Sequence, residues 1–474
     1  MSSTRTPSPD ALLFAGLLGL VVWVPLPLGS NRPWAWAILE IWVYLLAVLW
    51  LFALVRGRVA LTPVFRFARV PLLLLALWIA YVGMQIVPLP ISWLASISPE
   101  AARAHAAAVF PGPAPAYATI SVDPHVTAEG WLKSLAYALV FALVLLLARK
   151  RSRVKQLALA LVLGGLCQAT YGSLMTLSGA EYGFFYRKDS YLGVATGTFV
   201  NRNHLAGYLE MCLAVGIGML IATLEEARGM GWRQRLRDVA QLFVSAKIRL
   251  RLSLAVMVIA LVLTHSRMGN MAFFGSMLVA SAAGFALSRY ATRPAMILLA
   301  SLMLIDLAIV GTWFGVEKVV DRIGHTTMAA ELRDEVYSYA AEQWKDHLFV
   351  GSGLGTFYAV FPRYRGGDVA AYYDHAHNDY LQFGAETGVV GITLLGLLVA
   401  SSLGAALLAQ YRRRDPLMRG LGFAGVMGIT AILIHSATDF NLQIPANAMT
   451  FMILLALAWI ALYFKSAFPS EAAP

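Results

Sequence analysis

The stretch GVVGITLLGLLVASSLGAALLA, from Gly388 to Ala409, decides the fold class of this chain. It carries no charged residue, and as an α-helix it extends over roughly 33 Å at about 1.5 Å per residue. That length crosses the hydrocarbon core of a bilayer, which is about 30 Å thick. The whole chain has the same character, because 59% of its 474 residues are hydrophobic and only 13% are charged, against about 25% in ordinary soluble domains. The sequence therefore predicts an all-α, polytopic membrane protein.

Apolar runs of about 18 to 22 residues recur along the whole sequence, and most are long enough to span a membrane as a helix. We expect about twelve transmembrane helices from this count. The runs lie near residues 11–28, 34–55, 70–89, 131–148, 156–177, 204–223, 252–265, 270–288, 294–314, 388–409, 419–437 and 447–464.

The spacing of these runs divides the chain into three parts. Residues 1–314 are expected to carry transmembrane helices 1 to 9, with loops near 90–130 and 178–203. Residues 315–387 form a large helical loop between helices 9 and 10, and residues 388–474 carry helices 10 to 12.

The large loop has a pattern of its own. TTMAAELRDEVYSYAAEQWKDHLF (326–349) repeats apolar residues at helical spacing after two possible capping threonines, Thr326 and Thr327, which predicts an amphipathic helix across the mouth of the bundle. GSGLGTF (351–357) follows it. This motif differs from the phosphate-binding GxGxxG pattern and follows no strand, so we interpret it as a tight connection whose glycines adopt positive φ.

The net charge of +11 is unevenly distributed. Most Lys and Arg residues lie in short segments between apolar runs, such as RKRSRVK (149–155) and RRR (412–414). Cytoplasmic loops are enriched in these residues, so the pattern places both ends of the chain in the cytoplasm and the long segments near 90–130, 178–203 and 315–387 on the outer side. Topology accounts for the basic charge, and we expect no nucleic-acid partner.

Several basic residues on the outer side lie close to predicted entry points into the membrane. Each one alone is explained as an anchor whose head reaches the interface. Converging from separate elements, these residues would form a cationic pocket, because guanidinium groups bind phosphate oxygens in a bidentate manner. They are Arg187, Lys188, Arg202, Arg267, Arg363 and Arg365. A lipid pyrophosphate is the anion expected at that depth. Arg267 is the sharpest case, because it lies in a very short break between two apolar runs, where a charge is costly.

Carboxylates within or beside the predicted helices are also either structural or functional, because a charge there is costly. Glu210 lies two helical turns after Arg202, so it can pair with or orient Arg202 if one helix covers both. Asp439 lies at an outer helix end. For Glu40 and Asp306 we favour a structural hydrogen-bonding role.

The richest polar stretch is YYDHAHNDYLQFGAETGVVG, from Tyr372 to Gly391. Asn378 or Asp379 can cap the helix that follows. His375 and His377 admit three interpretations. They pack and cap the loop, they bind a metal together with Asp374 and Asp379, or one of them is a general base whose tautomer is fixed by a neighbouring carboxylate. We favour the general base, partly because of the family resemblance described next.

Five motifs together make the chain resemble the family of O-antigen ligases and O-antigen polymerases, which are bacterial membrane enzymes that use polyprenyl-pyrophosphate-linked glycans. Each motif is weak alone, but their order, and their placement on twelve predicted spans with a large late outer loop, are specific. The motifs are GTFVNRNHLAGYL (197–209), THSRMGN (264–270), WKDHLFVGSGLGTF (344–357), HNDYLQFGAETGVVG (377–391) and TDFNLQIP (438–445).

The resemblance implies a metal-independent, inverting glycosyl transfer that needs no cofactor. The donor would be a glycan on undecaprenyl pyrophosphate, and the reaction would face the periplasm from the bacterial inner membrane. The family's essential histidine maps to His377, although His375 in HAHN is an alternative. Its functional arginines map to Arg202 and Arg267, with Arg187 as a helper. The residues expected to support the site are Asn378, Glu386, Glu210 and Asp439.

The acceptor is open at this stage. An O-antigen ligase transfers the glycan to lipid A core oligosaccharide, whereas a polymerase of the same family transfers it to another lipid-linked repeat. We favour the ligase. A twelve-span transporter, with Glu40, Glu210 and Asp306 as a coupling path, is the alternative from another class. The expected partners are the lipid-linked glycan, the acceptor and membrane lipids.

Overall fold

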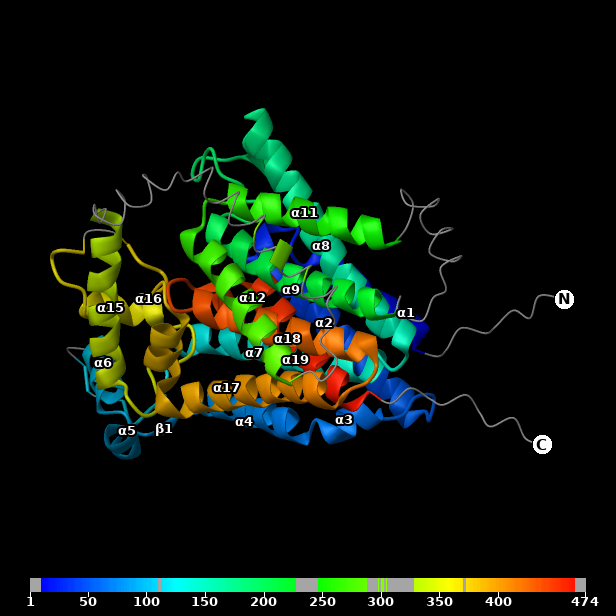
Figure 1. Cartoon of the computed structure of the whole chain (residues 1–474). Helices are drawn as coiled ribbons and strands as arrows, with labels where there is room; N and C mark the ends of the chain where they lie inside the picture. Colours follow the sequence, from blue (N-terminus) through cyan, green and yellow to red (C-terminus); the bar gives the residue numbers. More distant parts are fainter. Residues whose placement is uncertain are drawn as a thin grey trace, which may run out of the picture.

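The computed structural model describes residues 10–109, 112–113, 115–226, 246–287, 297, 300–301, 304, 328–369 and 372–464. Long α-helices lie side by side in one bundle, and shorter helices cover one of its ends (Figure 1). The strands among these residues form two antiparallel pairs, β1 (Leu89–Pro90) with β2 (Tyr117–Ala118) and β3 (Tyr182–Gly183) with β4 (Tyr186–Arg187). The expected all-α class is confirmed apart from these short pairs.

Among the residues that the structure describes, eight helices are long and apolar enough to cross a membrane, so the chain is a polytopic membrane protein. Each of them covers a run predicted from the sequence. They are α2 (Pro33–Val55), α7 (Pro124–Leu147), α8 (Arg151–Ser178), α9 (Arg202–Glu226), α12 (Arg267–Leu287), α17 (Asp379–Arg412), α18 (Pro416–His435) and α19 (Pro445–Tyr463).

Three more of the predicted runs form helices that do not meet this standard. Helices α1 (Ala11–Trp23) and α4 (Arg69–Gln85) are apolar but shorter, and prolines follow each of them closely. Helix α11 (Ala246–Leu263) begins with several basic residues. The predicted run 294–314 lies almost wholly outside the described residues, so the number twelve stays a prediction.

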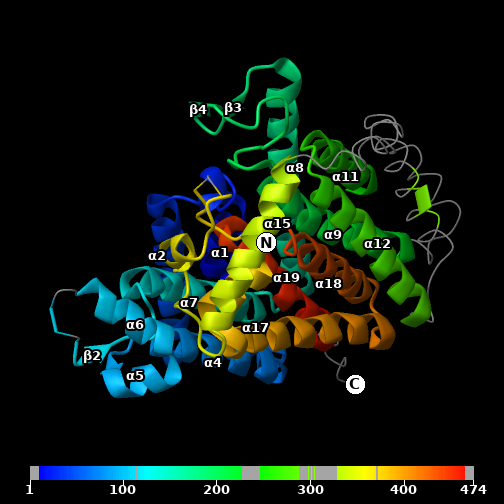
Figure 2. The ribbon, with the colours of Figure 1, turned by 90° about the vertical axis from the view of Figure 1, so that its left-hand side faces the viewer.

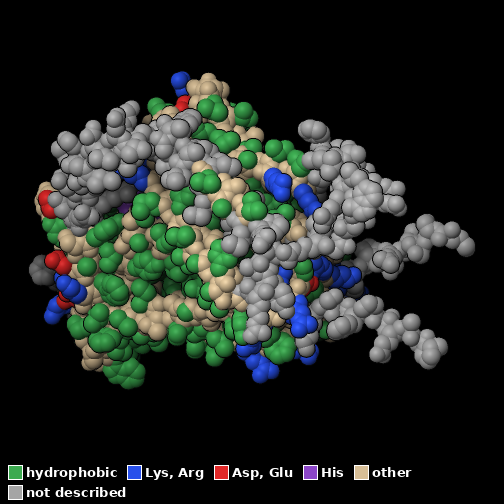
Figure 3. All heavy atoms as spheres, viewed as in Figure 1, with side chains coloured by type: hydrophobic (Ala, Val, Ile, Leu, Met, Phe, Trp, Pro, Cys, Tyr) green, Lys and Arg blue, Asp and Glu red, His purple; other side chains and the backbone are tan. Residues whose placement is uncertain are grey.

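One end of the bundle, the terminal end, carries Asp10, Arg149, Arg413 and Phe464. The buried carboxylate of Asp10 pairs with Arg149 at 2.7 Å and with Arg153 at 2.8 Å. The Arg413 guanidinium donates to the carbonyl of Phe464. Lys and Arg side chains gather over this end in Figure 3. It contains RKRSRVK (149–155) and RRR (412–414), two basic segments that the sequence assigns to the cytoplasm.

Two glycines let α9 and α18 cross at close range. A Cβ on Gly218 would lie 2.2 Å from the carbonyl oxygen of Gly420, and the reverse holds for Gly420. Small residues at such crossings bring helix backbones together in membranes, where packing rather than the hydrophobic effect holds helices to one another. Helix α9 is fully buried over most of its length, so this pair lies at the centre of the bundle.

Helix α17 is broken at Gly388, which has φ 62° and ψ −170°. A Cβ at this position would meet the Phe349 carbonyl at 2.3 Å, so only glycine fits. Carbonyls that the break leaves free are bonded by side chains of α4. Tyr81 donates to the Thr387 carbonyl at 2.7 Å, and Gln85 donates to the Glu386 carbonyl at 3.1 Å. The break therefore separates a membrane helix from an outer segment that α4 holds in place.

The end opposite the terminal end is called the histidine end, because it carries His377 and Asp439. Helix α15 (Met328–Asp346) lies across it (Figure 2), which confirms the helix expected over 326–349, while Thr326 and Thr327 lie outside the described residues. Its buried face packs on the segment that follows. The other short elements are η1 (Leu28–Ser30), α3 (Pro63–Phe67), α5 (Ile91–Ile97), α6 (Pro99–Ala108), α16 (Phe357–Val360), η4 (Phe361–Arg363) and η5 (Asn441–Gln443).

Candidate active site

Asp439, in the loop between α18 and α19, lies at the centre of the site. It is 1% exposed, and its Oδ1 atom lies 3.7 Å from both His377 Nδ1 and His204 Nε2. Oδ1 also accepts the backbone N–H of Phe440 at 2.8 Å, and Oδ2 accepts a hydrogen bond from the Asn203 side chain. Burial alone would raise the pKa of the Asp439 carboxyl, but the two histidines hold it well below its usual range. The carboxylate is therefore ionised at neutral pH.

His377 reaches this carboxylate from the loop before α17. Its backbone has φ 51°, which a residue other than glycine seldom adopts, and its carbonyl accepts a hydrogen bond from the Tyr337 hydroxyl at 2.9 Å. The ring packs edge-on against Phe440, with 4.8 Å between centroids, and 20% of the side chain stays exposed. Nδ1 is buried and faces Asp439 beyond hydrogen-bond distance, and the exposed part of the side chain leaves the ring accessible to a ligand.

His375 lies two residues earlier in a different environment. Its ring stacks on the Phe440 ring, with 4.2 Å between centroids, and Nδ1 lies 3.0 Å from Nε2 of Gln382. Burial lowers the pKa of His375 to about 4, although Asp374 and Gln382 act in the opposite direction. His375 is therefore neutral at pH 7 and faces an amide, whereas His377 faces a carboxylate.

Asn378 and Asp379 tie this loop to the α18–α19 loop. Asn378 caps α17, because its Oδ1 accepts the Leu381 N–H at 3.1 Å, so the sequence prediction of a cap at 378 or 379 is confirmed at Asn378. Asp379 Oδ2 instead accepts hydrogen bonds from Ser436 and from the Leu442 N–H. Among the residues that the structure describes, no three His, Cys, Asp or Glu side chains come together as metal ligands.

Glu386 lies behind His375 and holds the glycine-rich connection. Its carboxylate accepts the backbone N–H groups of Gly355 at 2.9 Å and Phe357 at 3.2 Å, and the side-chain amide of Gln382 at 3.1 Å. Gly351, Gly353 and Gly355 all have positive φ, as the sequence predicted. Glu386 therefore orients Gln382, which in turn contacts His375.

Glu210 does not pair with Arg202, and that expectation is wrong. The Glu210 carboxylate instead contacts His435 Nδ1 of α18 at 2.9 Å, and both side chains are 0% exposed. Arg202 is the first residue of α9, and its guanidinium lies 5.9 Å from the centre of the Tyr191 ring. The two side chains therefore have separate partners, and Glu210 supports the packing of α9 against α18.

The three predicted arginines lie on three elements. Arg202 begins α9 and Arg267 begins α12, and the first turns of these helices touch, because a Cβ on Gly269 would meet the Ala206 side chain at 2.6 Å. Arg202 directly precedes the residues that contact Asp439 and Phe440. Arg187 is exposed on β4, in a hairpin linked to Arg202 by the Tyr191 contact. Helix N-termini carry positive partial charge, which adds to that of Arg202 and Arg267.

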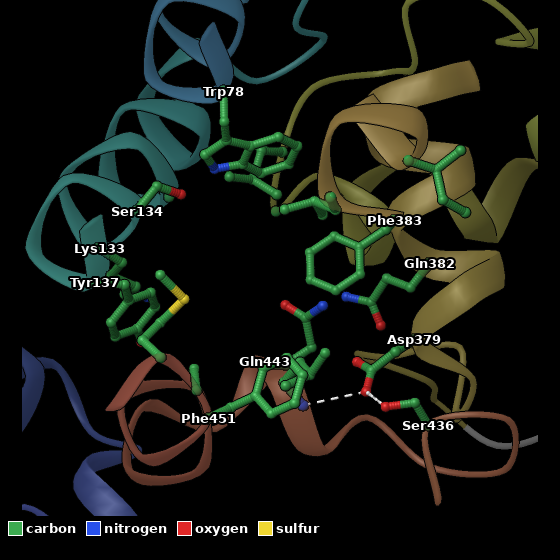
Figure 4. A pocket seen from close by; sticks show the side chains of 18 of the residues that line it. Trp78, Lys133, Ser134, Tyr137, Asp379, Gln382, Phe383, Ser436, Gln443 and Phe451 are labelled. Carbon is green, nitrogen blue, oxygen red and sulfur yellow. Dashed lines mark hydrogen bonds between the residues drawn. The ribbon is translucent and has the colours of Figure 1, made fainter. Parts of the chain in front are cut away.

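A cavity of about 550 Å³ opens beside His375. Most of its wall is apolar and comes from α4, α7, α17 and α19. In Figure 4, Gln382, Asp379 and Ser436 lie on one side, across the cavity from Trp78, Ser134 and Tyr137. The cavity therefore has a mostly apolar wall with polar side chains on the side next to the histidine cluster.

The sequence prediction missed several members of the cluster. His204 and Phe440 contact the two predicted histidines or Asp439, and His435 binds Glu210. His204 and Phe440 lie inside the quoted motifs GTFVNRNHLAGYL and TDFNLQIP. The motifs therefore marked these segments, but the sequence did not predict a role for these two residues. Gln382 likewise stands inside HNDYLQFGAETGVVG.

One part of the chain matches a known protein family. Residues 252–396 match the family model described as O-antigen ligase, and this stretch contains Arg267, His375, His377 and Glu386. Arg187, Arg202 and Asp439 lie outside the match. No curated protein matches the chain.

Proposed function

We propose that this protein transfers a glycan from undecaprenyl pyrophosphate to a sugar hydroxyl. The premise is that residues 252–396 form an O-antigen ligase domain of the kind shared by membrane-bound O-antigen ligases and polymerases. One observation carries the proposal. His377 is partly exposed and directs Nδ1 toward the buried, ionised carboxylate of Asp439. Such a pair removes a proton from a hydroxyl nucleophile.

In the proposed reaction, His377 accepts the proton of the acceptor hydroxyl as that oxygen attacks the anomeric carbon of the donor sugar. A bond forms between the acceptor oxygen and the anomeric carbon, and the bond between the anomeric carbon and the pyrophosphate oxygen breaks. The configuration at the anomeric carbon inverts. Asp439 stabilises the resulting imidazolium and keeps the ring oriented. His375 positions the loop through Phe440 and Gln382, and its lowered pKa keeps it neutral.

Arg202 and Arg267 are proposed to bind the pyrophosphate, with Arg187 as a second contact. The support is their position at the first residues of neighbouring helices. Helix N-termini and guanidinium groups both stabilise phosphate oxygens. The charge that develops on the leaving pyrophosphate would be stabilised there, so no metal ion is required in this proposal.

The apolar cavity beside His375 supports a lipid-linked substrate. Trp78, Phe383, Phe451 and other apolar side chains line most of it, and its polar lining includes His375, Asp379, Gln382, Glu129 and Lys133. A substrate with an apolar tail and a polar head has the same two parts. A transporter is less well supported, because the polar cluster gathers at one end of the helices and not at their middle.

Glycan transfer in vitro tests the proposal. The purified protein receives an undecaprenyl-pyrophosphate glycan, with or without lipid A core oligosaccharide, in the presence of EDTA. We expect His377→Ala to abolish transfer and His375→Ala to retain a measurable rate. Full activity of His377→Ala would overturn the assignment of the base.

The same assay identifies the acceptor. A single glycan transferred to the core would identify an O-antigen ligase, which is the activity that we favour. A ladder of products without the core would identify a polymerase. Loss of activity with EDTA, restored by a divalent cation, would contradict the metal-independent mechanism.

A further inference from the structure

A short hairpin beyond the outer end of α8 exposes large apolar side chains. It runs from Glu181 to Gly193 and contains β3 and β4, and we call it the 181–193 hairpin. Phe185 is 86% exposed and Leu192 is 59% exposed. In Figure 2 the hairpin and the end of α8 stand clear of the other elements. Apolar side chains gathered at one exposed place mark a surface that meets something other than water.

The hairpin has a defined shape. The Lys188 ammonium pairs with the Glu181 carboxylate at 2.6 Å and donates to the Val194 carbonyl at 2.9 Å. The other Glu181 oxygen accepts the Gly193 N–H at 2.7 Å, and the Tyr171 hydroxyl of α8 donates to the carbonyl of Tyr182. A buried ion pair and bonds to the helix thus fix the direction in which the apolar side chains point.

The exposed apolar surface continues along α8. Leu159, Leu163, Leu174 and Leu177 are each about half exposed or more. At about 100° per residue, these four positions fall within roughly 60° of one another, so they form one stripe. Because α8 is long and apolar enough to span a membrane, the stripe faces lipid, and it leads directly to the hairpin.

The length of α8 sets the depth of the hairpin. Its 28 residues extend over roughly 42 Å, and a bilayer measures about 40 to 45 Å with its headgroups. The helix starts at Arg151, beside the basic residues of the terminal end, and its length is sufficient for Ser178 to reach the headgroups of the opposite face. The hairpin that follows leaves the helix at that level.

We propose that the 181–193 hairpin docks into the lipid headgroups on the outer side of the membrane that α8 spans. Phe185 and Leu192 insert among the lipids, and Tyr182 lies where interfacial aromatic residues are enriched. Arg187, exposed on β4, lies at the level of the lipid phosphates, which complement its charge.

This docking has a consequence for the active site, which rests on the proposed function. The Tyr191 ring of the hairpin lies against the guanidinium of Arg202. A hairpin anchored at the interface therefore holds Arg202 at headgroup depth, which is the depth of the pyrophosphate of a lipid-linked donor.

Site-directed fluorescence quenching measures the depth directly. Cys167→Ser removes the exposed cysteine of α8, whereas Cys212 is buried and escapes labelling. Phe185→Cys in this background is labelled with an environment-sensitive fluorophore and placed in phosphatidylcholine–phosphatidylglycerol nanodiscs. Leu163→Cys near the middle of the lipid-facing stripe and Glu342→Cys on the exposed side of α15 are the lipid and water controls.

We expect a nitroxide near the headgroup end of the acyl chain to quench the label at position 185 more strongly than a nitroxide deep in the chain, and iodide in the water to quench it weakly. Strong quenching by iodide with none by either nitroxide would overturn the proposal. The hairpin would then be exposed to water, where its apolar side chains could bind a water-soluble glycan or protein. Stronger quenching by the deep nitroxide would overturn the interfacial depth.

Leu192→Cys is a second, independent label in case the first variant does not fold. The measurement needs no glycan transfer, so a failure of the proposed reaction leaves its result unchanged.

Discussion

The two ends of the bundle use the same residue types in different ways. At the terminal end, Arg149 and Arg153 pair with the buried carboxylate of Asp10, and Arg151 pairs with Asp415. At the histidine end, Arg187 and Arg267 are exposed, and no carboxylate among the described residues pairs with either of them.

Histidines, not arginines, surround the buried carboxylate at the histidine end. Asp439 lies within ion-pair distance of His204 and His377. At the terminal end, the fold pairs the carboxylates of Asp10 and Asp415 with arginines. At the histidine end it keeps one ionised carboxylate beside two histidines and leaves Arg187 and Arg267 exposed. Charge at the first end is expected to contribute stability, and charge at the second is expected to contribute activity.

The largest expected effect is at the histidine end. Asp439→Asn removes the charge that stabilises protonated His377 but keeps the amide oxygen that can accept the Phe440 N–H. We expect kcat for glycan transfer to fall by roughly 10² to 10⁴, the usual contribution of a positioned general base, while the Kd for the lipid-linked donor stays unchanged. Steady-state kinetics and donor binding measure the two quantities.

Asp415→Asn is the matched control for this variant. It removes a carboxylate that caps α18 and pairs with Arg151 at the terminal end. Its kcat per folded molecule should equal that of the wild type. Retention of more than about a tenth of the wild-type kcat by Asp439→Asn would contradict the proposed base.

The sequence predicted elements well where the information is local. The run from Gly388 to Ala409 begins at the break in α17, and hydropathy identifies such a run without reference to any neighbour. The cap at Asn378 and the positive φ of the glycines in GSGLGTF follow equally local rules.

The sequence predicted partners poorly where packing chooses them. Glu210 binds His435, which lies 225 positions away along the chain, and not Arg202, two turns away. Helices that are apolar all round do not reveal which face meets which neighbour, so the rotation of α9 against α18 is not encoded in hydropathy. His204 was missed for the same reason, since only the fold brings α9 to Asp439.

The second expected effect concerns the terminal end. Asp10→Asn removes the carboxylate that pairs with the buried guanidinium of Arg153, and breaking one side of a buried ion pair costs about 3 kcal/mol or more. We expect a clear fall in the melting temperature in detergent. Arg151→Ala is the control, because its partly exposed pair with Asp415 is worth under about 1 kcal/mol. Equal melting temperatures for the two variants would contradict the expectation that the buried ion pair contributes more stability than the partly exposed one.

A smaller effect is expected for Arg267, whose exposed guanidinium is proposed to bind pyrophosphate. One charge-assisted hydrogen-bonding group is worth about 1.5 to 3 kcal/mol, so Arg267→Ala should weaken binding of undecaprenyl pyrophosphate roughly 10-fold to 100-fold. Arg267→Lys should recover part of the loss, because a point charge remains. Arg58→Ala, an exposed arginine of the terminal end, should bind the ligand like the wild type. Unchanged affinity in Arg267→Ala would mean that this arginine is only an anchor.

The smallest effect separates the two neighbouring histidines through pH. Burial lowers the pKa of His375 from its usual 6.5 to about 4 in the folded protein, so the unfolded chain binds a proton more readily. The stability that His375 contributes is present above pH 6.5 and is lost as the pH falls from 6.5 toward 4. Between pH 7 and pH 5.5 the loss should be about 1 kcal/mol, measured as a fall of a few degrees in the melting temperature. His375→Asn, which keeps a polar group beside Gln382 and does not titrate, should flatten that dependence. If His375→Asn keeps the full dependence, the acid sensitivity arises elsewhere, and the contrast between a neutral His375 and a His377 that faces Asp439 loses its support.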